Sequence, residues 1–197
     1  MNKILIATKN QGKVEDFKVL FEPKGIEVVS LLDLDQTISN IEETGKTFSE
    51  NAILKSEAIS SLLKIPVISD DSGLEIDALD GEPGVYSARY AGLEKDDQAN
   101  IDKVLSNLKG INENARSARF VCAIALSKPG KDTSVELGYC EGTILTERRG
   151  KNGFGYDPIF KPLGYNCSMA ELSPDEKAAI SHRGNALRKI ADWLDKR

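Results

Sequence analysis

Short apolar runs alternate along the chain with stretches whose apolar residues recur at helical spacing. Residues 4–7 form an apolar run that predicts a buried strand, and the next segment places Val14, Phe17 and Phe21 on one face of a helix. A second strand is expected over residues 26–32. This order of strand, turn, helix and strand is typical of α/β proteins.

The clearest helical pattern covers residues 47–64 and ends before a proline. Thr47 and Glu50 have the spacing of a capping box. The expected apolar stripe consists of Phe48, Ala52, Ile59, Leu62 and Leu63. Lys55 lies in the middle of this stripe, so it needs either a compensating anion or a route to solvent past the stripe's edge. Its central position favours the anion.

The remaining pattern completes an α/β chain. Residues 67–69 predict a strand that ends at two aspartates, and residues 97–108 predict a helix. Residues 120–126 and 135–145 look like long strands joined through a Pro-Gly turn, and two helices follow near the C-terminus. Because no repeat or linker interrupts the pattern, we expect one domain over residues 1–197.

Composition narrows the class of partner. The chain has 197 residues, 40% of them hydrophobic, and a formal net charge of −5, which argues against nucleic acid but allows a small phosphorylated ligand in a basic pocket. The three cysteines show no metal-binding spacing. The first apolar run is too short for a secretory segment or a membrane span, so we expect a cytoplasmic protein that does not bind membranes.

Two acid pairs are candidates for a cation site. Asp70 and Asp71 follow a buried strand, where folding gives no reason for adjacent like charges, and carboxylate oxygens are the ligands that Mg²⁺ prefers. Glu42 and Glu43 could reach the same site. The alternative for the first pair is an ordinary Asp-Asp-Ser-Gly turn, and for the second a charged surface loop.

A polar segment between the first strand and helix is a candidate phosphate site. Residues 8–13 (TKNQGK) would present backbone N–H groups at a helix N-terminus together with lysines. The segment lacks the spacing of a Walker A loop. A solvated turn before the helix explains the same residues equally well.

Two C-terminal motifs could contact a base. Residues 153–157 (GFGYD) place an aromatic ring between glycines, which suits stacking on a flat base, although a surface turn with a buried ring has the same pattern. His182 is the only histidine of the chain and precedes Arg183, with Lys177 one helical turn earlier. A lone histidine is more often structural than catalytic, but beside an arginine it is a candidate for hydrogen bonding to a base or a phosphate.

With these motifs in their order, the chain resembles the non-canonical purine nucleoside triphosphate pyrophosphatases, the inosine triphosphatase-like (Ham1/RdgB) family. The resemblance is carried by residues 7–13 (ATKNQGK), 42–45 (EETG), Phe48, 50–52 (ENA), 69–74 (SDDSGL), 83–90 (PGVYSARY), 153–158 (GFGYDP) and 181–183 (SHR). It implies a long mixed β-sheet flanked by helices, two lobes with a central substrate cleft, and a homodimer. It also implies Mg²⁺-dependent hydrolysis of inosine, deoxyinosine and xanthosine triphosphates to the monophosphate and pyrophosphate.

The resemblance assigns roles by position. The triphosphate would be cradled by Thr8, Lys9, Asn10, Gln11, Gly12 and Lys13. Glu42 and Asp71 would hold the metal, and Asp71 would also accept the proton of the attacking water, with Asp70 left beside the metal or in the turn. Chemistry adds one further role: the departing pyrophosphate needs its negative charge neutralised by the metal and by lysine, and Lys13 and Lys55 are the candidates.

The remaining substrate contacts implied by the resemblance are Ser72, Phe154, Gly155, Tyr156, Asp157 and Lys177. His182 and Arg183 would read the 6-oxo edge of the purine, because donors placed for a carbonyl would be left unpaired against adenine's amino group. Two other functions remain open at this point. One is a Maf-type pyrophosphatase acting on pyrimidine or modified nucleotides, and the other is a nucleotide-binding regulator without catalysis.

Overall fold

A computed structural model describes residues 3–34, 38–39 and 41–194 and contains one six-stranded sheet. The strands are β1 (Lys3–Ile6), β2 (Glu27–Ser30), β3 (Val67–Ile76), β4 (Ser117–Ser127), β5 (Ser134–Ile144) and β6 (Phe160–Pro162). The helices are α1 (Gln11–Phe21), α2 (Phe48–Leu63), α3 (Asp97–Asn107), α4 (Pro174–Ile180) and α5 (His182–Leu194). The sheet order is β2-β1-β3-β4-β5-β6. Because β1 pairs in parallel with β2 and β3 while β5 and β6 are antiparallel, the predicted mixed α/β sheet is confirmed.

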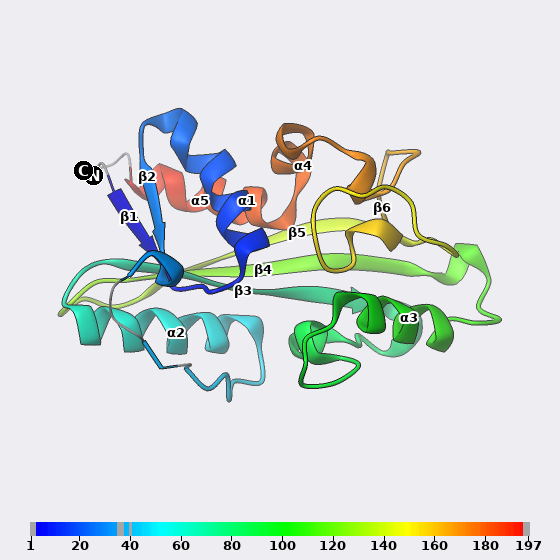
Figure 1. Ribbon diagram of the computed structural model, residues 1–197, viewed down its shortest axis with the longest axis horizontal. Coiled ribbons are helices and arrows are strands. Elements are labelled where there is room, and N and C mark those ends of the chain that lie inside the picture. Colours follow the sequence, from blue (N-terminus) through cyan, green and yellow to red (C-terminus); the bar gives the residue numbers. More distant parts are fainter. Residues whose placement is uncertain (1–2, 35–37, 40, 195–197) are drawn as a thin grey trace. The chain divides into compact units, whose positions relative to one another are not determined.

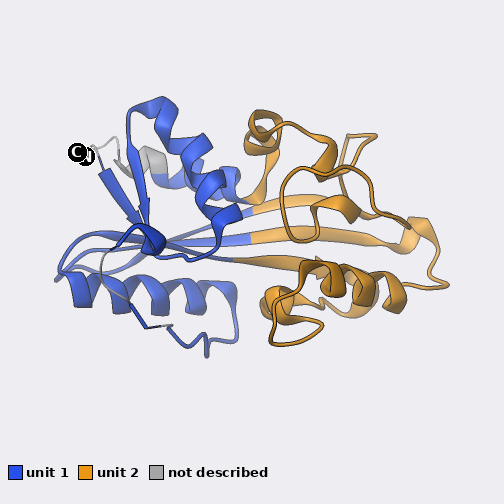
Figure 2. Ribbon diagram, in the orientation of Figure 1, with its two compact units in different colours: residues 1–71, 122–138, 183–197 blue, residues 72–121, 139–182 orange. Residues whose placement is uncertain are grey.

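The chain divides into two compact units (Figure 2). Unit 1 consists of residues 1–71, 122–138 and 183–197, and unit 2 of residues 72–121 and 139–182. The two units agree with the expected two lobes. The central cleft and the single domain over the whole chain remain predictions.

In unit 1 the strands bury side chains on both faces. Ile4 and Ile6 of β1 belong to a core cluster formed with α1 and α5, whereas Leu5 belongs to a second cluster formed with α2. Successive side chains of a strand point to opposite faces, so α1 and α5 cover one face and α2 the other (Figure 1). The same alternation governs β3.

Strand β3 is longer than predicted. It does not end before Asp70 but continues to Ile76, so the Asp-Asp-Ser-Gly segment is strand and not turn. β1 pairs with it only as far as Ile6, opposite Ile68, whereas β4 lies beside it on the other side. Pairing within the sheet overrides the local turn propensity. The aspartates therefore lie just past the end of β1, where β3 continues.

Helix α2 begins and ends close to the predicted residues, with two corrections. The Thr47 hydroxyl accepts the Glu50 N–H group at 3.1 Å, but the Glu50 carboxylate accepts from Lys46 and not from Thr47. Leu62 is 61% exposed, and the buried face contains Ser56 and Ser60 instead. Serines are tolerated there because their hydroxyls bond to backbone carbonyl groups.

In unit 2, α3 confirms the helix expected over residues 97–108. Ile101 and Val104 belong to the same core cluster as Leu74 and Ile76 of the second half of β3. Helix α4 begins at the capping box of Ser173. None of the helices in the described part of the chain has both the length and the apolar character needed to cross a membrane.

Candidate active site

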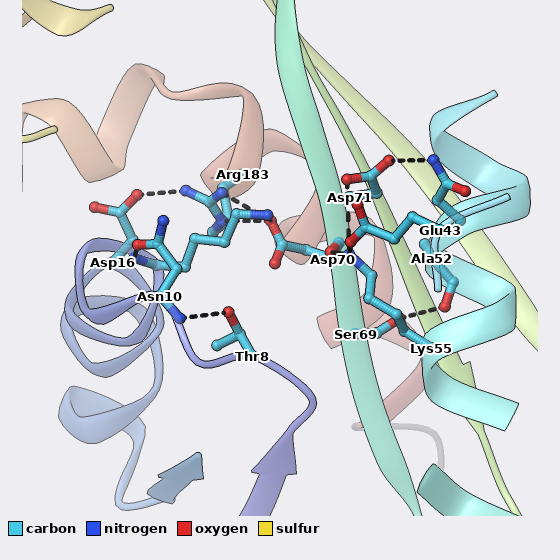
Figure 3. A network of polar contacts seen from close by, with 12 residues as sticks. Thr8, Asn10, Asp16, Glu43, Ala52, Lys55, Ser69, Asp70, Asp71 and Arg183 are labelled. Carbon is cyan, nitrogen blue, oxygen red and sulfur yellow. Dashed lines mark hydrogen bonds and ion pairs between the residues drawn. The ribbon is translucent and has the colours of Figure 1, made fainter. Parts of the chain in front are cut away.

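The adjacent aspartates of β3 point to opposite faces of the strand (Figure 3). Ser69, two residues before Asp71, donates its hydroxyl to the Ala52 carbonyl of α2, and Asp71 points the same way. Asp70 points toward α1 and the start of α5. The pair therefore forms two separate chemical environments and not one four-oxygen cluster.

Asp70 lies in a cationic environment. Its Oδ2 is 3.0 Å from Lys13 Nζ and 2.8 Å from Arg183 Nη2, and Arg183 also contacts the carboxylate of Asp16. The Asp70 side chain is fully buried. Burial acts to raise the pKa of Asp70, but the charges of Lys13 and Arg183 lower this pKa well below its usual range. Asp70 is thus held as a carboxylate that binds two cationic side chains.

Asp71 has one amide and one ammonium group as partners, and their effect on its pKa is weaker than that of burial. Asn51 of α2 donates to its Oδ2 at 3.0 Å, and Lys55 Nζ lies 3.6 Å from its Oδ1. Burial raises the pKa of Asp71 and the charge of Glu43 adds to that, while Lys55 opposes it; the net shift is upward. A buried carboxylate with a raised pKa holds a proton more readily than an ordinary aspartate, as a proton acceptor requires.

Lys55 has the compensating anions that its place in the helix required. Its Nζ donates to Glu43 Oε1 at 2.8 Å and to the Asp70 carbonyl at 2.6 Å. Burial lowers the pKa of Lys55, but Asp71, Asp70 and Glu43 outweigh burial and raise it. Asn51 and Lys55 reach β3 together because residues four apart share one face of a helix.

The segment before α1 makes local contacts of the kind that begin a helix. Asn10 is the N-cap, and its side chain accepts the Lys13 N–H group at 3.0 Å, while Thr8 Oγ1 accepts from Asn10. Lys9 donates to the Ile38 carbonyl at 2.7 Å. Gln11 and Gly12 form the first turn of the helix, and Gln11 donates to the side chain of Glu15, four residues further on. Capping and phosphate binding use the same backbone geometry, so phosphate binding by these residues remains a prediction.

The second acid pair is split as well. Glu42 is exposed, whereas Glu43 reaches Lys55 and shares that ammonium group with Asp71. The sequence interpretation paired Glu42 with Asp71 as metal ligands, but the structure brings Glu43 to Asp71. Across the described residues, no group of three or more histidine, cysteine or acidic side chains is gathered as a metal cluster.

Unit 2 gathers the aromatic loop around a buried ion pair. Asp157 Oδ2 lies 2.8 Å from Lys177 Nζ and also accepts the Phe154 N–H group at 3.0 Å. The same ammonium group lies 4.8 Å from the centre of the Phe154 ring. Gly153 has a φ of +75°, and a Cβ there would be 2.0 Å from Asp157 Oδ2, so the loop requires glycine at this position.

Other predicted contacts are placed as follows. In unit 2, Tyr156 is buried and donates its hydroxyl to the Ser87 carbonyl at 2.7 Å, and Ser72 is half-buried on β3. His182 is buried and stacks on Phe120, with ring centres 4.9 Å apart. In unit 1, Arg183 binds two carboxylates, so its function as a reader of the base remains a prediction.

Comparison with known proteins shows which family shares the sequence and fold of this chain. The profile of the Ham1 family matches residues 4–193. The chain belongs to the Ham1 family. A dITP/XTP pyrophosphatase of Oceanobacillus iheyensis is 56% identical over 194 residues, covering 98% of each chain.

Solved structures agree with this Ham1 assignment. The Staphylococcus aureus Ham1 protein is 48% identical, covers 98% of both chains and superposes with a TM-score of 0.85. A HAM1 protein from Coxiella burnetii is 41% identical, covers both chains completely and has a TM-score of 0.86. The family predicted from the sequence motifs is therefore confirmed.

In this Ham1 chain, sequence reasoning assigned no function to two site residues. Asp16 binds Arg183, and its signal was its position on α1 one turn after Lys13, on the same face. Asn51 binds Asp71, and its signal was its spacing of four residues from Lys55. Both signals are helical spacings whose meaning depends on a partner from another element.

Proposed function

We propose that this chain hydrolyses the triphosphates of inosine, deoxyinosine and xanthosine to the monophosphate and pyrophosphate. The observation that carries the proposal is its full-length match, at 56% identity, to a protein named dITP/XTP pyrophosphatase. The β3 site supports it, because it contains a buried carboxylate that can accept a proton and two lysines that can stabilise phosphate charge.

Asp71 is the proposed base. Its carboxylate is largely buried, and the Asn51 amide holds one of its oxygens. The upward pKa shift increases its affinity for the proton that a water molecule loses on attacking phosphorus. Asn51 fixes the orientation of the carboxylate while Oδ1 lies on the side of Lys55.

The lysines on the two faces of β3 are the proposed phosphate ligands. Lys13 follows the capped N-terminus of α1, so its charge adds to the partial positive charge of that helix end. Lys55 carries a positive charge beside Asp71. Pyrophosphate leaves with additional negative charge, which these ammonium groups would stabilise.

The donor set fits a divalent cation. The carboxylates of Asp71 and Glu43 lie near the same lysine, at 3.6 and 2.8 Å from Lys55 Nζ, and both supply hard oxygen donors. This chemistry suits Mg²⁺. We propose that Asp71 and Glu43 hold it, whereas the resemblance implies Glu42 as the second ligand. When bound, the cation supplies charge neutralisation for the triphosphate.

Base binding is proposed for the loop of unit 2. The Phe154 ring would stack on the purine, with Asp157 and Lys177 holding the loop beneath it. Ser72, His182 and Arg183 stay candidates for further contacts. A homodimer and a cytoplasmic location also remain predictions.

A product assay over a panel of nucleotides tests the proposal. With Mg²⁺, deoxyinosine, inosine and xanthosine triphosphates should yield pyrophosphate at rates well above those for ATP and thymidine triphosphate, and chelation with EDTA should stop the reaction. Preferred hydrolysis of thymidine triphosphate would favour the Maf-type function. Release of orthophosphate, or tight binding without turnover at any Mg²⁺ concentration, would overturn the proposal.

A further inference from the structure

Three consecutive residues of the aromatic loop are each anchored to a different group in unit 2. The Phe154 N–H group binds Asp157, and the Tyr156 hydroxyl binds the Ser87 carbonyl. Between them, the Gly155 N–H group donates to Asp97 Oδ2 at 2.8 Å. Asp97 belongs to helix α3 and is 58 residues away in the chain, so this bond ties the loop to a separate element.

The start of α3 contains two aspartates with different partners. Asp96 is the N-cap and accepts the N–H groups of Gln98 and Ala99 through Oδ1. Asp97 is the first residue of the helix, and its carboxylate bonds to the loop. The helix is therefore capped without Asp97, and local folding does not explain the bond to Gly155.

The conformation of the loop makes such an anchor consequential. Phe154 lies between Gly153 and Gly155, whose φ values are +75° and +58°. Glycine has the weakest backbone preferences of all residues, so external bonds and not local sterics decide where the ring between these two lies. Helix α3 influences the position of the Phe154 ring through the hydrogen bond between Asp97 and the Gly155 amide.

We propose that Asp97 is a positioning residue for nucleotide binding, acting through the Gly155 amide on the Phe154 ring. The inference rests on the proposed function, in which this ring stacks on the purine. Asp97 does not touch the substrate. It holds the loop in its binding conformation, so the free enzyme does not have to order the loop when the nucleotide arrives.

Steady-state kinetics of Asp97→Ala test the inference. The KM for deoxyinosine triphosphate and the Ki of inosine monophosphate should both rise about threefold to tenfold, the loss expected for one solvent-exposed hydrogen bond. The kcat should change less than about twofold, because the β3 residues are untouched. The Ki of inorganic tripolyphosphate, which has no base, should stay at the wild-type value.

Two further variants separate positioning from folding. Asp97→Asn keeps an acceptor oxygen and should restore most of the wild-type KM. Asp96→Ala should lower the melting temperature through loss of the cap but raise the KM less than Asp97→Ala, because it keeps the carboxylate of Asp97. An unchanged KM in Asp97→Ala, or an equal rise in the Ki of tripolyphosphate, would overturn the inference. A wild-type protein that hydrolyses none of the panel would instead overturn the proposed function.

Discussion

The two faces of β3 carry adjacent aspartates whose surroundings shift their pKa values in opposite directions. Asp70 is fully buried against Lys13 and Arg183, and its pKa is lowered. Asp71 is slightly less buried, has an amide and a more distant ammonium group as partners, and its pKa is raised. The alternation of strand side chains puts one residue against α1 and α5 and the other against α2.

This difference separates a structural charge from a chemical one. A carboxylate with a strongly lowered pKa is a poor proton acceptor, but it can hold two cationic side chains in place. A carboxylate whose pKa is raised by burial can take up a proton during a reaction. We therefore expect changes at Asp70 to affect stability and changes at Asp71 to affect turnover, and the predictions below test that division.

The largest effect is expected for Asp71→Asn. The amide keeps the size of the side chain and its contact with Asn51 but cannot accept the proton, so kcat for deoxyinosine triphosphate should fall by about 10²- to 10⁴-fold. The free energy of unfolding in urea should change by less than about 1 kcal/mol, because a desolvated charge is removed. Retention of more than a tenth of the wild-type kcat would show that Asp71 is not the base.

The reciprocal change, Asp70→Asn, should mainly affect folding. It removes the carboxylate shared by the part-buried Lys13 and the buried Arg183 and leaves Arg183 with Asp16 alone, a loss of about 3 kcal/mol in the free energy of unfolding. Urea titration of this variant beside Asp71→Asn makes the comparison direct. If both variants are equally stable, the functional division between the two faces is wrong.

Substitutions at Glu43 and at its neighbour Glu42 test which glutamate binds the metal together with Asp71. Glu43→Gln should lower kcat/KM at least about tenfold, the loss that even an indirect partner of a metal ligand causes, and should raise the Mg²⁺ concentration for half-maximal rate. Glu42→Gln, an exposed neighbour on the same loop, should stay within twofold of wild type. The reverse ranking would restore Glu42 as the metal ligand.

The smallest effect is on the pH dependence of stability in EDTA, where the two aspartates act in opposite directions. The Asp70 contribution is present above the ordinary pKa of 3.8 and is lost as the pH falls below it, because the folded pKa is lower. The Asp71 contribution is present below 3.8 and is lost as the pH rises toward the raised folded pKa.

Urea unfolding of the metal-free protein from pH 3 to 6 measures both slopes. Asp70→Asn should flatten the loss of stability on the acid side, and Asp71→Asn should flatten the loss above 3.8. Each slope should be about 1 kcal/mol per pH unit or less for a single group. Slopes of the same sign for the two aspartates would contradict the pKa shifts.

Much of the fold was predictable because hydrophobic periodicity reports which face of an element is buried. The helix over residues 47–64 and the strand at residues 4–7 follow directly from that pattern. The length of β3 did not follow, because Asp70 and Asp71 have low strand propensity and pairing with β4 stabilises them in extended conformation.

The candidate site was predictable as a set of motifs but not as a set of contacts. The motifs contain Lys13, Lys55 and the aspartate pair, and the structure places all of them around β3. Arg183 was assigned to the base, but the structure bonds it to Asp70 and Asp16. Such contacts join residues that are up to 167 positions apart, and no local pattern encodes them.

The sequence by itself determined the family, the order of the elements and the need of Lys55 for an anion, because these depend on motifs and on periodicity within single segments. Only the tertiary structure decided that Glu43 and not Glu42 approaches Asp71, and that Asp70 and Asp71 differ in pKa. In each acid pair, two neighbouring residues of the same type have side chains with different surroundings. The chemistry of each aspartate follows from its direction, because packing puts Lys13 and Arg183 on one face of β3 and Asn51 with Lys55 on the other.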